Sequence, residues 1–275
     1  MIEILSNFFQ KENIDHWAPI PLSECTVIRP YLLEREKIES GSVIMICVPY
    51  FTRDCMNPTR NVSTYAVSRD YHRYFKDLLA RLREHMYQHF PSHRFTAFAD
   101  HSPIAEVEAA AKAGLGVIGK NHLLLTQKYS SYVFLGELIT DAVLPSTPVE
   151  IQICKDCGRC QTHCPASSIA ECLSALTQKK GELTEEEIRM LQNHSLVWGC
   201  DLCQENCPYT QNAILRKSIF SPIPFFNQKT IPHLTLEALS AMSEEEFLER
   251  AYSWRGRNTI LRNLKLKESE GDSVC

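Results

Sequence analysis

The order of hydrophobic and polar positions in the first 150 residues predicts alternating strands and helices. Residues 42–49 (SVIMICVP) form an unbroken, β-prone apolar run, which is typical of a strand buried on both faces. Residues 71–89 instead place large apolar side chains at helical spacing, with Lys, Arg and Glu between them: Phe75, Leu78, Leu79, Leu82 and Met86. This spacing predicts an amphipathic helix.

Three further elements complete this front part. Residues 94–100 (RFTAFAD) and 132–140 (YVFLGELIT) predict two more strands. Between them, Ser102-Pro103 predicts a helix with proline at its first position, running through Ala105 to Ala113 and ending at Gly114. The prolines at 145 and 148 mark a boundary. We therefore expect an α/β domain over residues 1–148.

The second half of the chain contains two helix-start signals. Thr184 with Glu187 and Ser243 with Glu246 are capping-box patterns, which predict helices reaching about His194 and Ala251. Residues 213–232 are rich in Pro, Phe and polar residues and predict a linker. The expected fold class is α+β, with a front domain at 1–148, a cysteine-rich module at 149–212, and a linker with a C-terminal helical segment at 213–275.

Composition and charge exclude several functions. The 275 residues are 44% hydrophobic and 23% charged, as in ordinary globular proteins. The net charge of −4 argues against general nucleic-acid binding through bulk electrostatics. Five basic residues near the end form either a solvated helix face or a functional patch: Arg255, Arg257, Arg262, Lys265 and Lys267. The chain has neither a membrane-length apolar run nor a secretory start, so we expect a cytoplasmic protein.

The cysteines give the most specific chemical signal. Eight of the twelve lie between Cys154 and Cys207, whereas a secreted disulfide protein would spread them along the chain. Cys154-x2-Cys157-x2-Cys160-x3-Cys164-Pro165 is the bacterial ferredoxin spacing, and this run favours [4Fe–4S] clusters over zinc. The spacing predicts two clusters, and hence a role in electron transfer.

The second cysteine motif determines how the ligands divide. Cys200-x2-Cys203-x3-Cys207-Pro208 is one cysteine short of a repeat, and Cys172 is the cysteine of the block that remains unassigned. Because the fourth cysteine of a ferredoxin run serves the neighbouring cluster, we assign one cluster to Cys154, Cys157, Cys160 and Cys207. The other cluster takes Cys164, Cys172, Cys200 and Cys203. The alternative for Cys172 is a buried structural thiol.

An ordered set of motifs resembles the epoxyqueuosine reductases, which are cobalamin-dependent relatives of the reductive dehalogenases. The resemblance covers residues 40–265, approximately. It is carried by 65–72 (YAVSRDYH), 100–106 (DHSPIAE), 113–121 (AGLGVIGKN), 131–140 (SYVFLGELIT), 172–177 (CLSALT) and 198–204 (WGCDLCQ), with 254–256 (WRG) and 262–263 (RN) behind the clusters.

The resemblance implies a nitroreductase-like front domain that binds base-off cobalamin and a ferredoxin-like module with two [4Fe–4S] clusters. Electrons from a low-potential donor would then drive conversion of epoxyqueuosine to queuosine in tRNA. Asp100 occupies the position of the family's proton donor, and a desolvated site would raise its pKa. Without the family, Asp100 would be read as a strand end that caps the next helix.

Four other positions fall in segments that line the cofactor in the family: Ser131, Leu135, Ser174 and Asp201. Ser131 and Leu135 fit core packing equally well. His72 resembles the family's motif histidine, although an exposed or satisfied histidine is its simpler interpretation. Gly114 to Gly119 fits G-x-G-x-x-G, but it follows a helix instead of linking a strand to one, which excludes a dinucleotide loop. By resemblance, this loop approaches the corrin.

Two departures from the family pattern leave rival functions open. Full-length members continue into helical repeats that help hold tRNA, and this sequence ends at Cys275 without them; the loop from Cys164 to Cys172 is also shorter than usual. One rival keeps the cofactors and takes a small-molecule substrate. The other is a non-catalytic electron-transfer protein. We expect a monomer without membrane contact.

Overall fold

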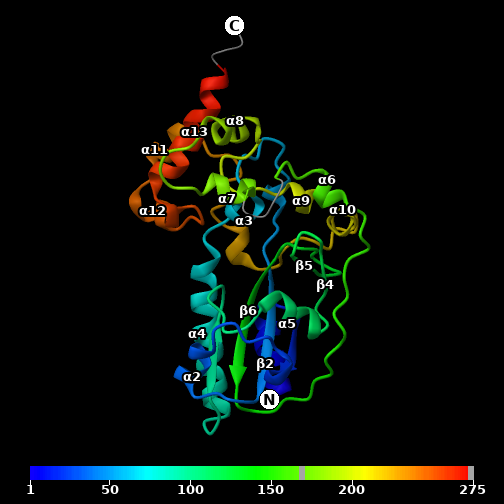
Figure 1. Ribbon diagram of the computed structural model, residues 1–275. Helices are drawn as coiled ribbons and strands as arrows, with labels where there is room; N and C mark the ends of the chain where they lie inside the picture. The colour runs from blue at the N-terminus through cyan, green and yellow to red at the C-terminus, as the bar shows by residue number, and fades with distance from the viewer. Residues whose placement is uncertain (167–170, 272–275) are drawn as a thin grey trace. The chain divides into compact units, whose positions relative to one another are not determined.

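The computed structural model describes residues 1–166 and 171–271, which form two compact units. Unit 1 consists of Met1–Tyr50, Tyr71–Gly158 and Pro208–Ile223. Unit 2 consists of Phe51–Asp70, Arg159–Cys207 and Pro224–Cys275. Each unit is therefore assembled from three separate stretches of chain (Figure 1).

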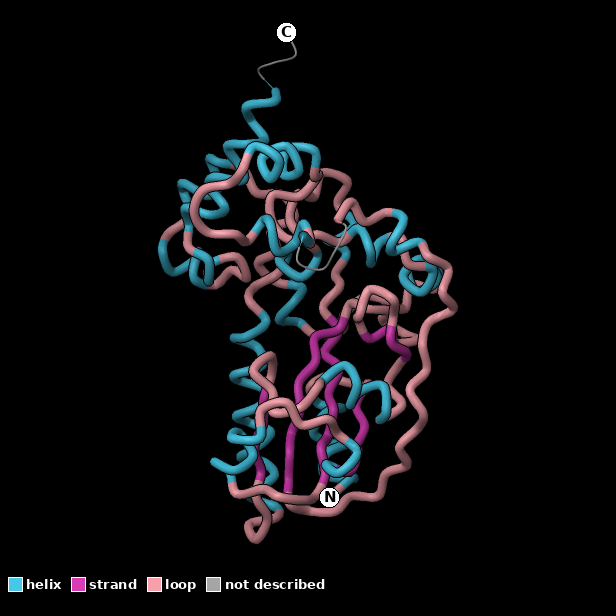
Figure 2. The backbone as a smooth tube through the Cα atoms, in the orientation of Figure 1, coloured by secondary structure: helices cyan, strands magenta, loops and turns pink. Residues whose placement is uncertain are grey.

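A four-stranded antiparallel sheet is the framework of unit 1. Its strand order is β1 (Trp17–Pro21), β2 (Ser42–Pro49), β6 (Val133–Thr140) and β3 (Phe95–Phe98), drawn in magenta in Figure 2. A separate hairpin pairs β4 (Val117–Ile118) with β5 (Leu124–Leu125). The helices are α1 (Ile2–Lys11), α2 (Pro30–Glu36), α4 (Tyr71–His89), α5 (Glu106–Lys112) and α10 (Pro208–Leu215), with a 3-10 turn at Leu22–Glu24.

Helices cover both faces of this sheet. Val43, Met45 and Cys47 of β2 pack in one cluster with Ala109–Ala111 of α5. The long helix α4 packs against β3 and β6 on the other face, where Phe75 lies over Gly136. A Cβ atom at Gly136 would lie 2.5 Å from the Phe75 ring, so the close approach requires glycine. Every residue of β2 is buried, as its apolar run predicted.

The predicted elements of the front part are confirmed with two adjustments. β2 and α4 have the predicted bounds, and β3 and β6 lie within the predicted ranges. The helix predicted from Ser102-Pro103 instead begins at Glu106, because Pro103 O accepts hydrogen bonds from the amides of Ile28 and Arg29. The sequence reading missed α1, β1 and α2. The amphipathic α1 packs against α4 and buries Leu5, Phe8 and Phe9.

The regular elements of unit 2, in the part that the structure describes, are helices joined by loops. Its α-helices are α3 (Thr64–Val67), α6 (Arg159–Thr162), α7 (Leu173–Thr177), α8 (Glu185–Asn193), α9 (Leu202–Glu205), α11 (Leu236–Ala241), α12 (Glu244–Leu248) and α13 (Arg257–Gly271). Its 3-10 turns are Arg53–Met56, Pro224–Asn227 and Ser253–Arg255. Leu173, Leu176 and Leu191 form a small core, and α13 packs on α7, α8 and α11.

Both capping boxes form, at Thr184 and Ser243. The second helix ends at Leu248, before the predicted Ala251, because Glu249 O accepts from the Asp70 amide and Arg250 bridges to Arg69. Residues 213–215 of the predicted linker belong to α10. Among the described residues, no helix has the length and apolar character needed to cross a bilayer.

Candidate functional site

Asp100 has a left-handed backbone conformation two residues after β3. Its φ of +64° is uncommon for a residue with a side chain. Tyr71 Oη donates a hydrogen bond to Asp100 Oδ2 at 2.6 Å, and His72 Nε2 lies 2.6 Å from the same oxygen. The first two residues of α4 therefore hold this half-exposed carboxylate, which has a side-chain exposure of 48%.

The predicted rise in the pKa of Asp100 is wrong for this arrangement. Burial by itself raises the pKa, but the hydrogen bonds from His72 and Tyr71 and the interaction with His72 outweigh it, so the pKa lies below its usual value. Desolvation of Asp100 can be expected from the sequence, whereas the two donors on one of its oxygens are visible only in the structure. Asp100 is consequently ionised at neutral pH in this conformation.

Aromatic rings form a continuous stack next to Asp100. Phe134 of β6 stacks on Tyr71 with ring centroids 4.0 Å apart, and on Tyr50 with centroids 4.1 Å apart. Tyr71 also stacks on His72, at 4.2 Å. This stack packs the first turn of α4 against β6 next to Asp100. The sequence alone did not predict this stack, because its rings come from three separate segments of the chain.

Two more carboxyl groups lie behind Asp100 and were also missed. Glu137, in the middle of β6, is fully buried, and Ser102 Oγ donates to its Oε1 at 2.5 Å. The carboxyl of Glu106 lies close enough to Glu137 for the two groups to interact, and the backbone amide of Asp100 is near it. The available signal was a glutamate inside the apolar run of a buried strand.

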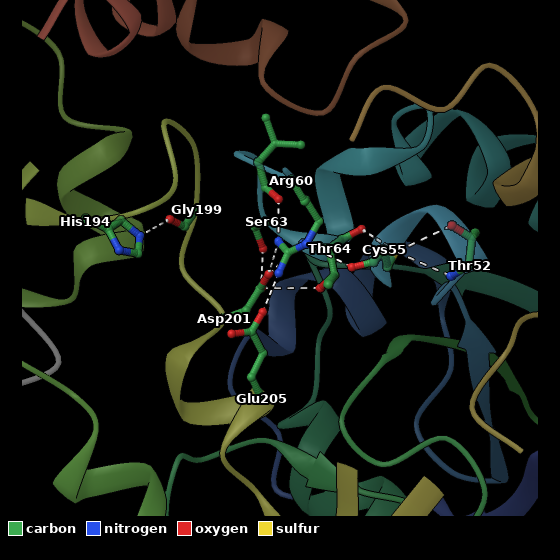
Figure 3. A network of polar contacts seen from close by, with 10 residues as sticks. Thr52, Cys55, Arg60, Ser63, Thr64, His194, Gly199, Asp201 and Glu205 are labelled. Carbon is green, nitrogen blue, oxygen red and sulfur yellow. Dashed lines mark hydrogen bonds and ion pairs between the residues drawn. The ribbon is translucent and has the colours of Figure 1, made fainter. Parts of the chain in front are cut away.

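In unit 2, Asp201 is the centre of a buried polar network (Figure 3). Its Oδ2 accepts from Arg60 Nη1 and from the Thr64 amide, both at 2.8 Å. Its Oδ1 accepts from Ser63 Oγ at 2.5 Å and from Thr64 Oγ1 at 3.3 Å. The carboxylate is thus saturated with donors. Its predicted contact with a corrin stays a prediction, and such a contact would have to come from the Asp201 backbone.

The same network fixes the segment that carries Cys200 and Cys203. Arg60 also pairs with Glu205 of α9. On the other side of Asp201, the Gly199 amide donates to Thr177 Oγ1 at 2.8 Å, and His194 Nε2 lies 3.0 Å from Gly199 O. Arg60, His194, Asp201 and Glu205 line one pocket of unit 2. The backbone on both sides of Cys200 is therefore held by buried hydrogen bonds.

The cysteines predicted to bind the second cluster partly gather in unit 2. Cys172 and Cys203 both lie within electrostatic reach of Cys200, and Cys172 is the N-cap of α7. Helix α6, which contains Cys160, packs against α9, which contains Cys203. All cysteines within residues 1–166 and 171–271 are free, without a disulfide. Among residues 1–166 and 171–271, however, no three His, Cys, Asp or Glu side chains are grouped closely enough to hold a metal ion, so the ligation of this cluster stays a prediction.

The other predicted ligands and contacts are divided between the units. Cys154 and Cys157 belong to unit 1, whereas Cys160, Cys164 and Cys207 belong to unit 2, so the first cluster stays a prediction. In unit 1, Ser131 is buried, and Leu135 of β6 packs against the core on the α5 side. In unit 2, Ser174 on α7 is half-buried and its Oγ accepts from Gln178 at 3.2 Å.

Two other sequence features have structural explanations. The glycine-rich loop at 114–119 follows helix α5 and enters the β4–β5 hairpin. It does not link a strand to a helix, which agrees with the exclusion of a dinucleotide-binding loop. Arg257 and Arg262 of the basic tail donate to backbone carbonyls, including Leu239 O at 2.5 Å and Gly181 O at 2.9 Å. Lys267 bonds to Gln192 O. These side chains therefore stabilise the α13 packing.

Comparisons with known proteins point to one family. The family model described as epoxyqueuosine reductase QueG, DUF1730, matches residues 37–101. The epoxyqueuosine reductase of Escherichia coli (strain K12) is 39% identical over 235 residues, which cover 80% of this chain and 60% of that protein. The epoxyqueuosine reductase of Gloeobacter violaceus is 32% identical over 216 residues, covering 75% of this chain and 68% of that protein.

A solved structure shares the fold. The crystal structure of an epoxyqueuosine reductase with an epoxyqueuosine-modified tRNA-Tyr stem loop aligns with a TM-score of 0.78. The alignment covers 99% of this chain and 82% of that one at 23% identity. The chain spans about 60% of the length of the first curated relatives that it matches.

Proposed function

This chain belongs to the epoxyqueuosine reductase family, and from that premise we propose that it is an iron–sulfur and cobalamin-dependent reductase that converts epoxyqueuosine to queuosine in tRNA. The geometry around Asp100 is the observation that carries this proposal. It combines a carboxylate, a histidine in proton-transfer range and the aromatic stack that positions them. The complex of a structural relative with an epoxyqueuosine-modified tRNA stem loop supports tRNA as the substrate.

The eight clustered cysteines provide the ligands for two [4Fe–4S] clusters within a ferredoxin-like module over residues 149–212. Cys164, Cys172, Cys200 and Cys203 would hold one cluster, and the contacts around Cys200 fit that set. Cys154, Cys157, Cys160 and Cys207 would hold the other. Bound clusters and bound cobalamin would supply the electrons for the reaction, from a low-potential donor.

Cobalamin would bind to the nitroreductase-like front domain over residues 1–148. Ser131 and Leu135 are the contacts proposed from this domain, and Ser174 and Asp201 those proposed from the cysteine module. Leu135 shares the α5 side of β6 with Glu137, two residues further along the same strand. The remaining residues, 213–275, would form the linker and helical segment. We propose a cytoplasmic monomer.

Asp100 would control the proton balance of the reaction. Reductive removal of an epoxide oxygen as water consumes a pair of electrons and a pair of protons. Ring opening leaves an alkoxide, which a nearby acid must protonate. Because Asp100 is ionised in this conformation, it has to receive a proton before it can donate one. His72, at 2.6 Å, is placed to supply that proton.

The test is conversion of epoxyqueuosine by protein reconstituted without oxygen, with cob(II)alamin and a strong reductant. We expect the tRNA nucleoside to lose one oxygen atom. Turnover of a small epoxide, with modified tRNA untouched, would support the small-molecule alternative. No turnover in either arm would contradict a reductase, and intact clusters without a bound corrin spectrum would favour the electron-transfer protein.

A further inference from the structure

A carboxyl group at the centre of the unit 1 sheet has no role in the proposed reaction so far. Glu137 pairs with Met45 of β2 and Phe98 of β3, and its exposure is 0%. An ionised carboxylate is strongly disfavoured at such a position unless donors surround it. The contacts of Glu137 therefore indicate which protonation state the sheet accommodates.

One oxygen of Glu137 has a donor and the other has none. Ser102 Oγ donates to Oε1 at 2.5 Å, and the same hydroxyl accepts from the Ile104 amide at 3.1 Å. Glu137 Oε2 is buried, and no donor within the described residues reaches it. Glu106 Oε1 is in the same situation.

The two oxygens without donors belong to carboxyl groups that lie within hydrogen-bonding reach of each other. Ionised carboxylates only accept hydrogen bonds, so two facing carboxylates leave both groups unsatisfied and in repulsion. A single proton on either group turns this contact into a hydrogen bond.

Burial and the neighbouring carboxylates both favour the protonated form of this pair. Burial first, and then the charge of Glu106, raise the pKa of Glu137 well above its usual value. Burial first, and then the charge of Asp100, raise the pKa of Glu106 to about 7. The other ionisable groups facing the pair are Arg29, which opposes the rise, and the buried thiol of Cys25.

We propose that Glu106 and Glu137 share one proton at neutral pH and that this shared proton holds residues 100–106 in the conformation that presents Asp100. Glu106 and Glu137 are positioning residues, since they act through Asp100. The shared proton is inferred from the burial and contacts of the two carboxyl groups. Its effect on catalysis rests on the function proposed for Asp100.

The segment from Asp100 to Glu106 is held at several points that depend on this pair. Asp100 has a φ of +64°, a conformation that persists only when its surroundings fix it. Its amide lies near the Glu106 carboxyl, and Ser102 Oγ donates to Glu137. A further hydrogen bond, from Arg29 Nη1 to Ser102 O at 2.8 Å, does not involve the pair. Loss of the proton would leave two charged, buried carboxylates next to each other, Glu106 at the end of this segment and Glu137 on β6. Their repulsion would destabilise the segment's conformation.

Infrared spectroscopy of the protein tests the shared proton without any turnover. We expect a carbonyl band of a buried carboxylic acid at neutral pH in the unmodified protein. The substitution Glu137→Gln should remove that band. Glu108→Gln is the matched control, because Glu108 lies on the same helix as Glu106. Glu108 accepts from Thr26 and Lys112 and its pKa is lowered, so the band should remain in this variant. A spectrum without the band at neutral pH would overturn the proposal.

Hydrogen exchange of residues 99–105 tests the positioning. Glutamine at 137 keeps a permanent donor towards Glu106, so E137Q should exchange like the unmodified protein at neutral pH and show no extra exchange at alkaline pH. Glu137→Leu fills the space but removes both hydrogen bonds, and we expect about tenfold faster exchange of this segment. Equal exchange in both variants at every pH would contradict positioning. These readouts remain valid even if the protein reduces no epoxide.

Discussion

His72 Nε2 lies 2.6 Å from Asp100 Oδ2, the oxygen to which Tyr71 Oη also donates. Two donors on one oxygen stabilise the ionised form of Asp100. The side chain that the proposed reaction requires as an acid is therefore held as a base by its neighbours. A proton must reach Asp100 through His72 or from solvent before it can protonate an alkoxide.

Removing the histidine should release the carboxyl group from this control. In His72→Ala, we expect the pKa of Asp100 to rise towards its usual value, because the largest of the interactions that lower it is gone. A carbon-13 NMR titration of aspartate side chains measures this shift. His93→Ala is the matched control, since His93 pairs with Asp141 at 2.9 Å and should shift that residue alone. An unchanged Asp100 titration in His72→Ala would be inconsistent with this account.

The buried glutamate pair predicts an unusual pH dependence of stability. A carboxyl group whose pKa is raised on folding stabilises the native state fully below its unfolded pKa, about 4.3, and loses that contribution as pH rises through the folded value. For Glu106 the folded value is about 7. Denaturant unfolding should show the free energy of unfolding falling between about pH 5 and pH 8.

Glu137→Gln should flatten that slope, because its amide needs no proton to satisfy Glu106. Asp100 acts in a separate window. Its pKa is lowered on folding, so its contribution disappears as pH falls through the folded value and does not affect the neutral range. The same slope in Glu137→Gln and the unmodified protein would mean that the pair does not hold a shared proton.

Asp201 should contribute strongly to the stability of unit 2. Asp201→Ala leaves Arg60, Ser63 and Thr64 without their buried acceptor, and breaking a buried pair in this way costs about 3–5 kcal/mol. Denaturant unfolding of the protein under reducing conditions measures the loss. Asp77→Asn removes an exposed i,i+4 pair with Arg81 and should cost less than about 1 kcal/mol. Similar losses for both variants would argue against a structural role for the network.

Iron content tests the assignment of Cys172. The unmodified protein, prepared without oxygen, should hold about eight iron atoms per chain, and Cys172→Ala should lose roughly half of them. Cys25→Ala is the control, because Cys25 is a buried thiol of the unit 1 core outside the cysteine block. Full iron retention in Cys172→Ala would return Cys172 to its alternative interpretation as a structural thiol.

Local sequence patterns predicted the elements whose signal is contained within the element itself. The apolar run of β2, the spacing of α4 and the capping box at Thr184 are of this kind. The start of α5 was misplaced because Pro103 bonds to residues 28 and 29, about 75 positions earlier in the chain. Contacts of that range leave no trace in a local pattern.

The candidate site shows the same limit. Sequence reasoning identified Asp100, but its pKa depends on Tyr71 and His72, which reach it from another element. Glu137 lies within the quoted segment 131–140 and was given no role there, although a glutamate in a largely apolar strand was visible as an anomaly. The cysteine spacing was informative on its own because Cys154, Cys157 and Cys160, three of the ligands assigned to one cluster, lie within a few residues of each other.

Single-turnover reduction of epoxyqueuosine in tRNA is the most direct test of the central claim. Cluster-loaded, cobalamin-loaded protein should convert the nucleoside to queuosine, and Asp100→Asn should slow that step by about 10²-fold or more with corrin binding unchanged. Asp141→Asn, at the other histidine-paired aspartate, should react at the unmodified rate. Fully loaded protein that leaves epoxyqueuosine intact, or an Asp100→Asn variant as fast as the unmodified protein, would contradict the account.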